Sequence, residues 1–153
     1  MGTTISPRCK YTYHIDDWNS REWRTAWRQL VKDTPKIIDA AKILLSGRPG
    51  EDPTVHVEKG IYINGDGGEA EEPLRIEPGI TDWSFETRGK PYDAVVACTL
   101  LRAQSLASGQ FKLRSNREWP KYWGVARGLY LTVWPDKFFN SPVEAGIWRR
   151  NGA

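Results

Sequence analysis

Eight tryptophans among 153 residues constrain the fold of this chain more than any other feature. Four of them form two pairs with a four-residue step, Trp23 with Trp27 and Trp119 with Trp123. Side chains four residues apart lie on the same face of an α-helix. Each pair therefore predicts a helix with one strongly aromatic face, and rings of this size need a shared core to bury them.

Length and composition indicate a single globular domain over residues 1–153. A chain of this size buries roughly 68–70% of its unfolded surface, and 39% hydrophobic with 27% charged residues is ordinary for such a domain. No apolar run approaches the roughly 18 residues that span a membrane, and residues 1–7 lack the apolar stretch of a signal peptide. We therefore expect no membrane partner and a cytoplasmic location.

The first part of the chain predicts a strand and two helices. Apolar residues alternate over residues 11–15, which is typical of a strand. Asn19 stands three residues before Glu22, the spacing of a capping box, so the first helix is expected to begin there. Pro35 suits the first position of a second helix, and Gly47 is expected to end it.

The rest of the chain alternates strands and helices. Period-two patterning predicts further strands near residues 55–57, 61–63, 74–76, 83–87 and 111–115. Helices are expected to begin at Pro91 and near Pro120. The apolar residues of the tail are expected to pack on the core: Phe138, Phe139, Ile147 and Trp148. This order predicts an α+β fold, a small mostly antiparallel sheet of about four to five strands packed by three to four helices.

The composition argues against a metal or a cofactor. Two histidines and two cysteines, spread along the sequence, do not form a recognisable ligand set. The glycine-rich turn at residues 64–68 leads into acids and a strand rather than a helix N-terminus, so it does not predict a phosphate loop. We expect no cofactor and no metal, and a hairpin loop at this turn.

A strand-to-helix corner is the first candidate for a binding site. Its candidate ligand-binding residues, with one from the glycine-rich turn, are Thr87, Arg88, Lys90, Tyr92, Asp93 and Asn64. A helix N-terminus carries about half a positive charge, and two cations at the same place suit a phosphate or carboxylate. The alternative is structural, with Asp93 capping the helix and pairing with Arg88 or Lys90 to lock the turn.

A basic helix face is the second candidate. Arg21, Arg24 and Arg28 follow the spacing i, i+3, i+7 and share one side of the first helix. Arginines combined with tryptophans can bind nucleic acid through phosphate contacts and base stacking. The alternative is that the tryptophans point inward and the arginines are simply solvated.

Acid–base chemistry has only a weak basis in this sequence. His14 and Asp16 stand close together in the sequence and could form a catalytic site with a distant acid such as Asp93. No nucleophile accompanies them in a recognisable motif. We therefore expect a non-enzymatic protein and keep an enzyme as a further alternative.

The order of several short segments resembles a known group of proteins. Asn64-Gly65 is followed by Glu72-Pro73-Leu74, and residues 85–93 end in Lys-Pro-Tyr-Asp, with Ser115 then preceding a tryptophan-containing helix. This pattern, over roughly the second half of the chain, resembles small uncharacterised proteins encoded in tailed-bacteriophage genomes. Asn116 and Arg117 stand where that group carries an acid and a glycine.

The resemblance implies a phage or prophage origin and a host-cytosol setting. Small accessory proteins of this kind block host factors or sequester signalling nucleotides, which is an argument by analogy. The net charge of +3 permits an anionic partner without requiring one. Our leading hypothesis is a non-enzymatic binding protein for an anionic, nucleotide-like ligand or a host protein. Nucleic acid is the alternative partner, and the oligomeric state is open.

Overall fold

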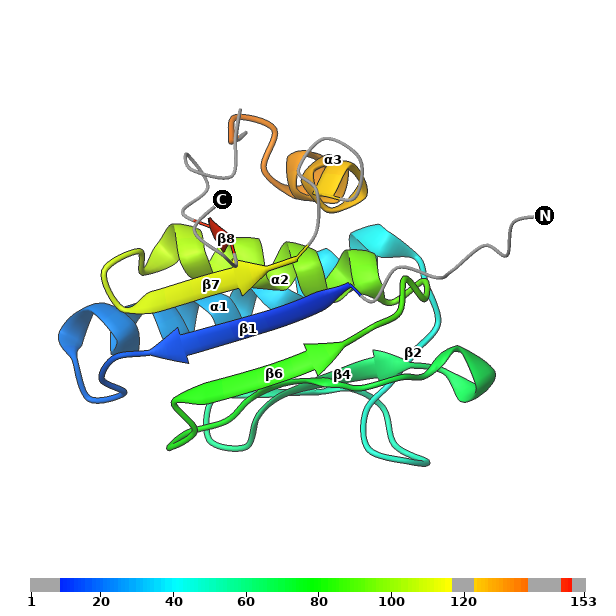
Figure 1. Cartoon of the computed structure of the whole chain (residues 1–153), viewed down its shortest axis with the longest axis horizontal. Coiled ribbons are helices and arrows are strands. Elements are labelled where there is room, and N and C mark those ends of the chain that lie inside the picture. Colours follow the sequence, from blue (N-terminus) through cyan, green and yellow to red (C-terminus); the bar gives the residue numbers. More distant parts are fainter. Residues whose placement is uncertain (1–8, 117–122, 138–146, 150–153) are drawn as a thin grey trace.

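Short strands and three long helices alternate along the chain (Figure 1). The computed structural model describes residues 9–116, residues 123–137 and the backbone of residues 147–149. The elements are β1 (Lys10–Ile15), α1 (Arg21–Ala41), β2 (Leu45–Ser46), β3 (Thr54–His56), β4 (Gly60–Gly65), η1 (Gly67–Glu69), β5 (Leu74–Ile76), β6 (Asp82–Glu86), α2 (Asp93–Leu106), β7 (Phe111–Ser115), α3 (Trp123–Val133) and β8 (Ile147–Arg149). The predicted α+β class is confirmed. The expectations for Trp119, Pro120, Phe138 and Phe139 lie outside the described residues.

The strands divide between two small sheets. The first has the order β6-β1-β7-β8, in which β1 pairs antiparallel with β6 and β7 while β8 runs parallel to β7. In the second, β4 pairs antiparallel with β2, β3 and β5. The edge strand β6 borders β5, and the indole N–H of Trp83 on β6 donates to the Pro73 carbonyl at 3.0 Å. The two sheets therefore adjoin along β5 and β6.

Helix α1 is one continuous helix, so the predicted break before Pro35 is wrong. Proline lacks the N–H that the helix needs and costs about 3 kcal/mol in a helix interior. Leu30 before it and Ile37 after it are both fully buried in the same core. The burial of both halves holds the helix together, and Pro35 lies on its exposed side.

Both predicted ends of the first helical region are also corrected. The N-cap is Ser20, whose hydroxyl accepts from the Trp23 N–H at 3.1 Å, and not Asn19. The helix ends at Ala41 with Lys42 in the left-handed conformation, well before Gly47. Leu44, which follows the end of the helix, is 80% exposed. The chain leaves the helix early because β2, which follows, pairs with the end of β4.

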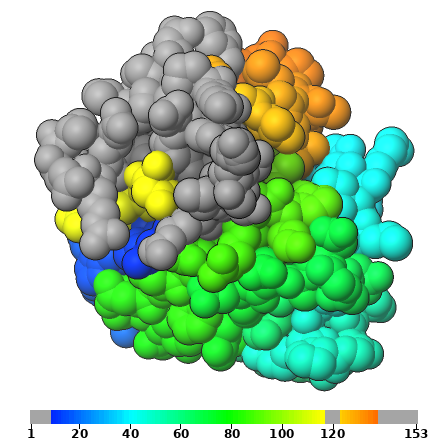
Figure 2. All heavy atoms as spheres, turned by 45° about the vertical axis from the view of Figure 1, so that its right-hand side comes forward, coloured from blue at the N-terminus to red at the C-terminus, as the bar shows by residue number. Residues whose placement is uncertain are grey.

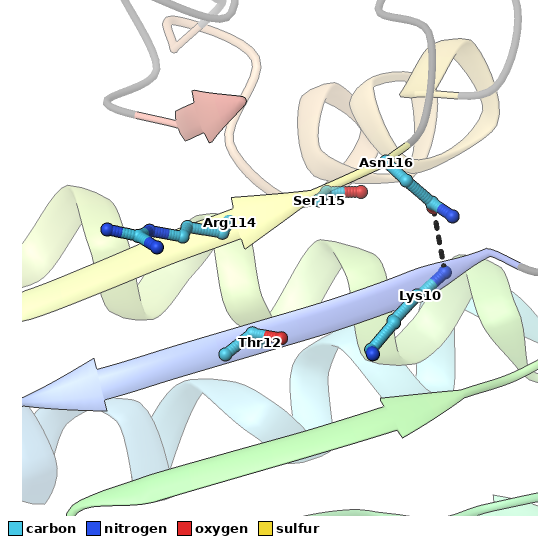
Figure 3. Close-up of a pocket in the computed structure, with 5 residues that line it drawn as sticks. All are labelled: Lys10, Thr12, Arg114, Ser115 and Asn116. Carbon is cyan, nitrogen blue, oxygen red and sulfur yellow. Dashed lines mark hydrogen bonds between the residues drawn. The ribbon is translucent and has the colours of Figure 1, made fainter. Parts of the chain in front are cut away.

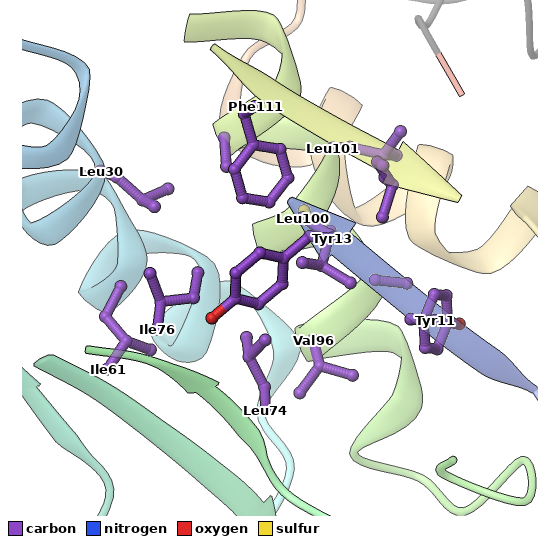
Figure 4. Packing of buried hydrophobic residues seen from close by; sticks show 14 of the residues in the cluster. Tyr11, Tyr13, Leu30, Ile61, Leu74, Ile76, Val96, Leu100, Leu101 and Phe111 are labelled. Atoms are coloured by element: carbon purple, nitrogen blue, oxygen red, sulfur yellow. The ribbon is translucent and has the colours of Figure 1, made fainter. Parts of the chain in front are cut away.

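Aromatic rings join α1 to both sheets in the core. Trp23 of α1 stacks on Phe111 of β7 with ring centroids 5.7 Å apart, and Phe111 stacks on Tyr13 of β1 at 5.2 Å. Figure 4 shows Tyr13 at the centre of this packing, between Phe111 and the Leu74 side chain of the second sheet. Each ring pair adds about 0.5–1.5 kcal/mol beyond the burial of its area. The inward-facing helical pair is therefore confirmed at Trp23 and Trp27, which are 0% and 5% exposed.

Helices α1 and α2 cover one face of the first sheet, and α3 packs across them (Figure 1). A buried ion pair joins α1 and α2, with Arg102 Nε 2.8 Å from Asp33 Oδ2. Arg102 also donates to the Tyr130 hydroxyl of α3 at 3.1 Å and lies over the Trp134 ring at 4.1 Å. One guanidinium thus connects all three helices. Helix α3 lies at the molecular surface (orange in Figure 2).

Both cysteines lie in the interior of the protein. Cys9 and Cys98 are both buried and are not joined in a disulfide, and burial raises the pKa of Cys98 to about 12. Such a thiol is a buried hydrophobe rather than a nucleophile. Among the described residues, no helix is both long and apolar enough to cross a membrane.

Candidate functional site

The corner at residues 87–93 is built around a buried carboxylate. Asp93, at the start of α2, is 7% exposed. Its Oδ1 accepts hydrogen bonds from the Tyr11 hydroxyl at 2.7 Å and from the Thr87 hydroxyl at 2.5 Å. These bonds tie the end of β6 and the start of α2 to β1. Asp93 therefore serves the corner as a buried acceptor, and Thr87 is a donor to it.

The two cations of the corner are held by acids from the preceding loop. Arg88 Nε lies 3.2 Å from Glu71 Oε1, and Lys90 Nζ lies 4.0 Å from Glu69 Oε2. The sequence had suggested Asp93 as their partner, whereas the structure brings in carboxylates from residues 69–72. Both ion pairs are at least partly exposed, so a competing anion meets charges that are already neutralised.

The remaining two candidate residues of this region bind backbone groups. The Tyr92 hydroxyl donates to the Glu72 carbonyl, and burial raises the pKa of Tyr92 above its ordinary value. Asn64 Nδ2 donates to the Glu71 carbonyl at 2.8 Å, while its Oδ1 accepts from the Glu71 N–H at 3.0 Å. The structure thus brings Asn64 and the corner together around residues 69–72. Every one of the six candidate residues takes part in an interaction that supports the fold.

The outer face of α1 differs from the corner in charge balance. Arg21, Arg24 and Arg28 are exposed, and Lys32 extends their row by one more turn. None of these four side chains makes an ion pair with any other residue that the structure describes. At a rise of 1.5 Å per residue, the row is roughly 16 Å long. We call these four residues the basic strip.

Two acids close to the basic strip in the sequence are engaged with backbone amides. Glu22 Oε2 accepts from the Gly109 N–H at 3.0 Å, which ties the first turn of α1 to the loop before β7. Asp17 Oδ1 accepts from the Asn19 N–H at 2.9 Å just before the helix. The fold uses these carboxylates elsewhere, and the arginines remain free to meet an external anion.

Two hollows adjoin the basic strip and share a wall. One, of about 270 Å³, is lined by polar and cationic side chains: Asn19, Arg21, Arg24, Thr25 and Arg28. The other, of about 250 Å³, is mainly apolar and is lined by Trp18, Arg24, Trp27, Arg28, Val57 and Pro78. Arg24 and Arg28 line both hollows, so a cationic and an apolar surface meet along these two side chains.

The outer face of the first sheet carries a further hollow that sequence patterning did not identify. It measures about 200 Å³ and lies where the start of β1 runs beside the end of β7 (Figure 3). Lys10 and Thr12 come from β1, and Arg114, Ser115 and Asn116 come from β7 and the residue after it. The period-two alternation that predicts both strands also places Lys10, Thr12 and Arg114 on the face opposite to Tyr11. This shared face is the sequence signal that could have identified the hollow.

A further hollow, between two loops of the second sheet, is acidic. It measures about 680 Å³ and lies between the loop after β2 and the turn after β4, with Glu51, Asp52, Asp66 and Glu71 in its lining. The described residues hold no group of three or more His, Cys, Asp or Glu side chains placed to bind a metal ion.

The residues of the enzyme alternative lie apart. His14 is on the outer face of β1, where its Nδ1 lies 2.7 Å from Asp82 Oδ1 and its Nε2 lies 3.1 Å from Asp16 Oδ1. The hydrogen bond from His14 lowers the pKa of Asp82. Asp93 is bound by Tyr11, which points to the inner face of the same strand. The structure therefore separates His14 and Asp16 from Asp93 by the sheet itself.

Comparisons with known proteins add no family to these observations. No protein-family model, no curated protein and no solved structure matches the chain. The likeness to phage accessory proteins remains a prediction from the sequence.

Proposed function

We propose that this protein binds nucleic acid through the basic strip on α1. The observation that carries the proposal is the charge balance of Arg21, Arg24, Arg28 and Lys32, four exposed cations in one row without a described carboxylate partner. Lysine and arginine side chains bind phosphates and release the counterions condensed on the nucleic acid. A row of unpaired cations along one helix supplies several such contacts at once.

The sequence predicts the corner as an anion site, but the cations of the corner are less available to an external anion than those of the basic strip. A phosphate at Arg88 or Lys90 would have to displace Glu71 or Glu69 from its ion pair. Arg21, Arg24 and Arg28 need no such exchange. On electrostatic grounds the same anion is therefore expected to bind more strongly at the basic strip.

The test compares two triple variants that remove the same charge. The first is Arg21→Gln, Arg24→Gln and Arg28→Gln. The second is Arg88→Gln, Lys90→Gln and Lys137→Gln, which removes three positive charges elsewhere and includes both cations of the corner. Binding of labelled single-stranded and duplex oligonucleotides is measured by fluorescence anisotropy over a range of salt concentrations.

The basic-strip variant is expected to lose affinity and salt dependence together. Each lost phosphate contact lowers the slope of log affinity against log salt by about 0.7 on a single strand and about 0.9 on a duplex. The basic-strip variant should therefore lose about 2.1 units of slope on a single strand and about 2.7 on a duplex, whereas the corner variant should keep the slope of the wild type. Loss of binding in the corner variant alone, or no binding by the wild type at low salt, would contradict the proposal.

A small anionic ligand at the sheet hollow is the second candidate. Lys10 and Arg114 come from neighbouring strands, make no ion pair among the described residues, and line this hollow with the hydroxyl of Thr12. The ligand proposed for this hollow is the nucleotide-like anion that the sequence predicts, but its site is on the first sheet and not at the corner. Isothermal titration with inorganic phosphate and with nucleoside monophosphates, on the wild type and on Lys10→Gln with Arg114→Gln, tests it. Equal heats in both proteins would eliminate the site.

A further inference from the structure

We infer that the apolar hollow beside the basic strip receives one unstacked base of a single-stranded nucleic acid, while the adjoining cationic hollow holds the phosphate of the same strand. This inference rests on the proposed function and specifies its substrate class. It depends on the shared wall of the two hollows, because Arg24 and Arg28 line both of them. A nucleotide has the same division, with an apolar aromatic base at one end and an anionic phosphate at the other.

The apolar hollow has rings that are already fixed in place. Trp27 packs edge to face on Trp18, with ring centroids 5.2 Å apart. The Trp18 indole N–H donates to the Ile80 carbonyl at 2.6 Å, and the Trp27 indole N–H donates to the Val57 carbonyl at 2.9 Å. Both polar tips are therefore satisfied within the chain. The partly exposed Trp18 ring contributes aromatic surface to the hollow, and Trp27, which is only 5% exposed, holds that ring in place. Preorganised aromatic surface is what base stacking requires.

The opposite wall of the apolar hollow consists of exposed residues. Val57 is 42% exposed after β3, and Pro78 is exposed in the turn after β5. A hydrophobic surface left in water beside four unpaired cations suits a partner that is both apolar and anionic. A nucleotide meets both requirements within one small unit, with the base suited to the hollow of about 250 Å³ and the phosphate to the hollow of about 270 Å³.

Duplex nucleic acid presents its phosphates to the protein but keeps its bases inaccessible. In a duplex the bases are paired and stacked inside, so an apolar hollow on a protein surface reaches a base only in a single strand or after unpairing. The basic strip alone would bind both forms by charge. The apolar hollow should therefore add a preference for single strands on top of that charge-driven binding.

The experiment compares strands that differ only in their bases. The probes are a labelled oligo(dT) strand, an abasic strand with the same number of phosphates, and a duplex of the same length. The proteins are the wild type, Val57→Phe, which fills the apolar hollow from its exposed wall, and Val125→Phe. Val125 is 66% exposed on α3 and makes the matched control for a larger apolar side chain.

The wild type is expected to bind oligo(dT) roughly tenfold to a hundredfold more tightly than the abasic strand, the range that one base stacked on aromatic rings provides. Val57→Phe should lose this preference and keep its affinity for the abasic strand. Val125→Phe should behave as the wild type. Circular dichroism verifies the fold of each variant, and the comparison of the two strands on the wild type needs no variant at all.

The outcomes separate the two proposals. Equal binding of oligo(dT) and the abasic strand by the wild type would overturn the base-binding inference and leave nucleic-acid binding by charge intact. No binding of any probe at low salt would overturn the proposed function itself. A further test adds free thymidine monophosphate to the complex with oligo(dT), at the same total nucleotide concentration as the strand. Displacement of the strand under these conditions would also overturn the inference, because the hollows would then bind a free nucleotide.

Discussion

The corner at residues 87–93 and the outer face of α1 are both rich in cations, yet they differ in what surrounds those cations. Arg88 and Lys90 face Glu71 and Glu69, which the chain brings back from the loop after β4. The basic strip has no such partner among the described residues, because Glu22 and Asp17 bind backbone amides instead. Cations in a short segment therefore indicate a binding site only when the fold leaves them unpaired.

The largest effect is expected where a cation is paired in the interior. Arg102→Ala would leave Asp33, which is 1% exposed, without its closest partner. Removing one member of a buried pair costs about 3–5 kcal/mol, and we expect the lower end because Lys36 Nζ also lies 3.4 Å from Asp33. Urea unfolding followed by tryptophan fluorescence measures the change in the free energy of unfolding.

A double variant provides the control for this pair. Arg102→Met with Asp33→Leu removes both charges and fills the space with apolar groups, which is often close to neutral for a buried ion pair. The double variant is therefore expected to unfold at higher urea than Arg102→Ala. A loss of less than about 1 kcal/mol in the free energy of unfolding of Arg102→Ala is typical of an exposed ion pair. Such a result would show that the pairing of Arg102 with Asp33 does not stabilise the protein as a buried pair does.

Asp93→Ala is expected to have the next largest effect. It leaves the buried hydroxyls of Tyr11 and Thr87 without their common acceptor. Each unsatisfied buried donor costs about 1–3 kcal/mol, so we expect a loss of about 2–3 kcal/mol in the free energy of unfolding. Asp93→Asn keeps an acceptor oxygen and should lose less. Equal stability of Asp93→Ala and the wild type would contradict the structural role of the corner.

A smaller effect on stability is expected when the acids that pair with the cations of the corner are neutralised, so that these cations become unpaired like those of the basic strip. Glu69→Gln with Glu71→Gln frees Lys90 and Arg88, and because both ion pairs are partly exposed the protein should lose less than about 1 kcal/mol in stability. Affinity for oligonucleotides at low salt is expected to rise roughly twofold to fivefold.

The matched control for the corner adds the same charge elsewhere. Asp39→Asn with Asp136→Asn neutralises two exposed acids, one in α1 and one after α3, and neither of them lines the hollow that Glu71 lines. An equal rise in affinity in both double variants would attribute the effect to net charge rather than to the freed cations, and the comparison between the two regions would fail.

The smallest effect on stability is expected at the basic strip itself. Arg21→Gln, Arg24→Gln and Arg28→Gln replace exposed side chains that support no described ion pair, so the free energy of unfolding should change by no more than about 0.5 kcal/mol. A thermal melt measures this directly. A large loss of stability would show that the arginines serve the fold, as the cations of the corner do.

Much of the fold follows from periodicity along the chain. The four-residue step correctly predicted that Trp23 and Trp27 point inward, and the same spacing placed Arg21, Arg24 and Arg28 on the solvent side. The strand patterns are confirmed at β1, β4, β5, β6 and β7. These predictions succeed because they depend on which face of one element is buried, and the order of apolar residues determines that face.

The errors lie where distant segments decide a local outcome. Pro35 does not end a helix because Leu30 and Ile37 are buried in one core on either side of it. Gly47 does not end the helix because the preceding residues pair with β4. In both cases a local preference worth a few kcal/mol is outweighed by packing and strand pairing that only the assembled fold provides.

The sequence by itself determined the types of the elements, the α+β class and the separation of rings from arginines on α1. The tertiary structure decided which cations are paired, because an ion pair depends on the approach of residues far apart in the chain, such as Arg88 and Glu71. It also assembled the apolar hollow, whose walls come from α1, the segment before it and two distant loops at Val57 and Pro78. Periodicity acts within a turn or two of one element, whereas charge pairing and hollows arise between elements, so only the folded chain reveals them.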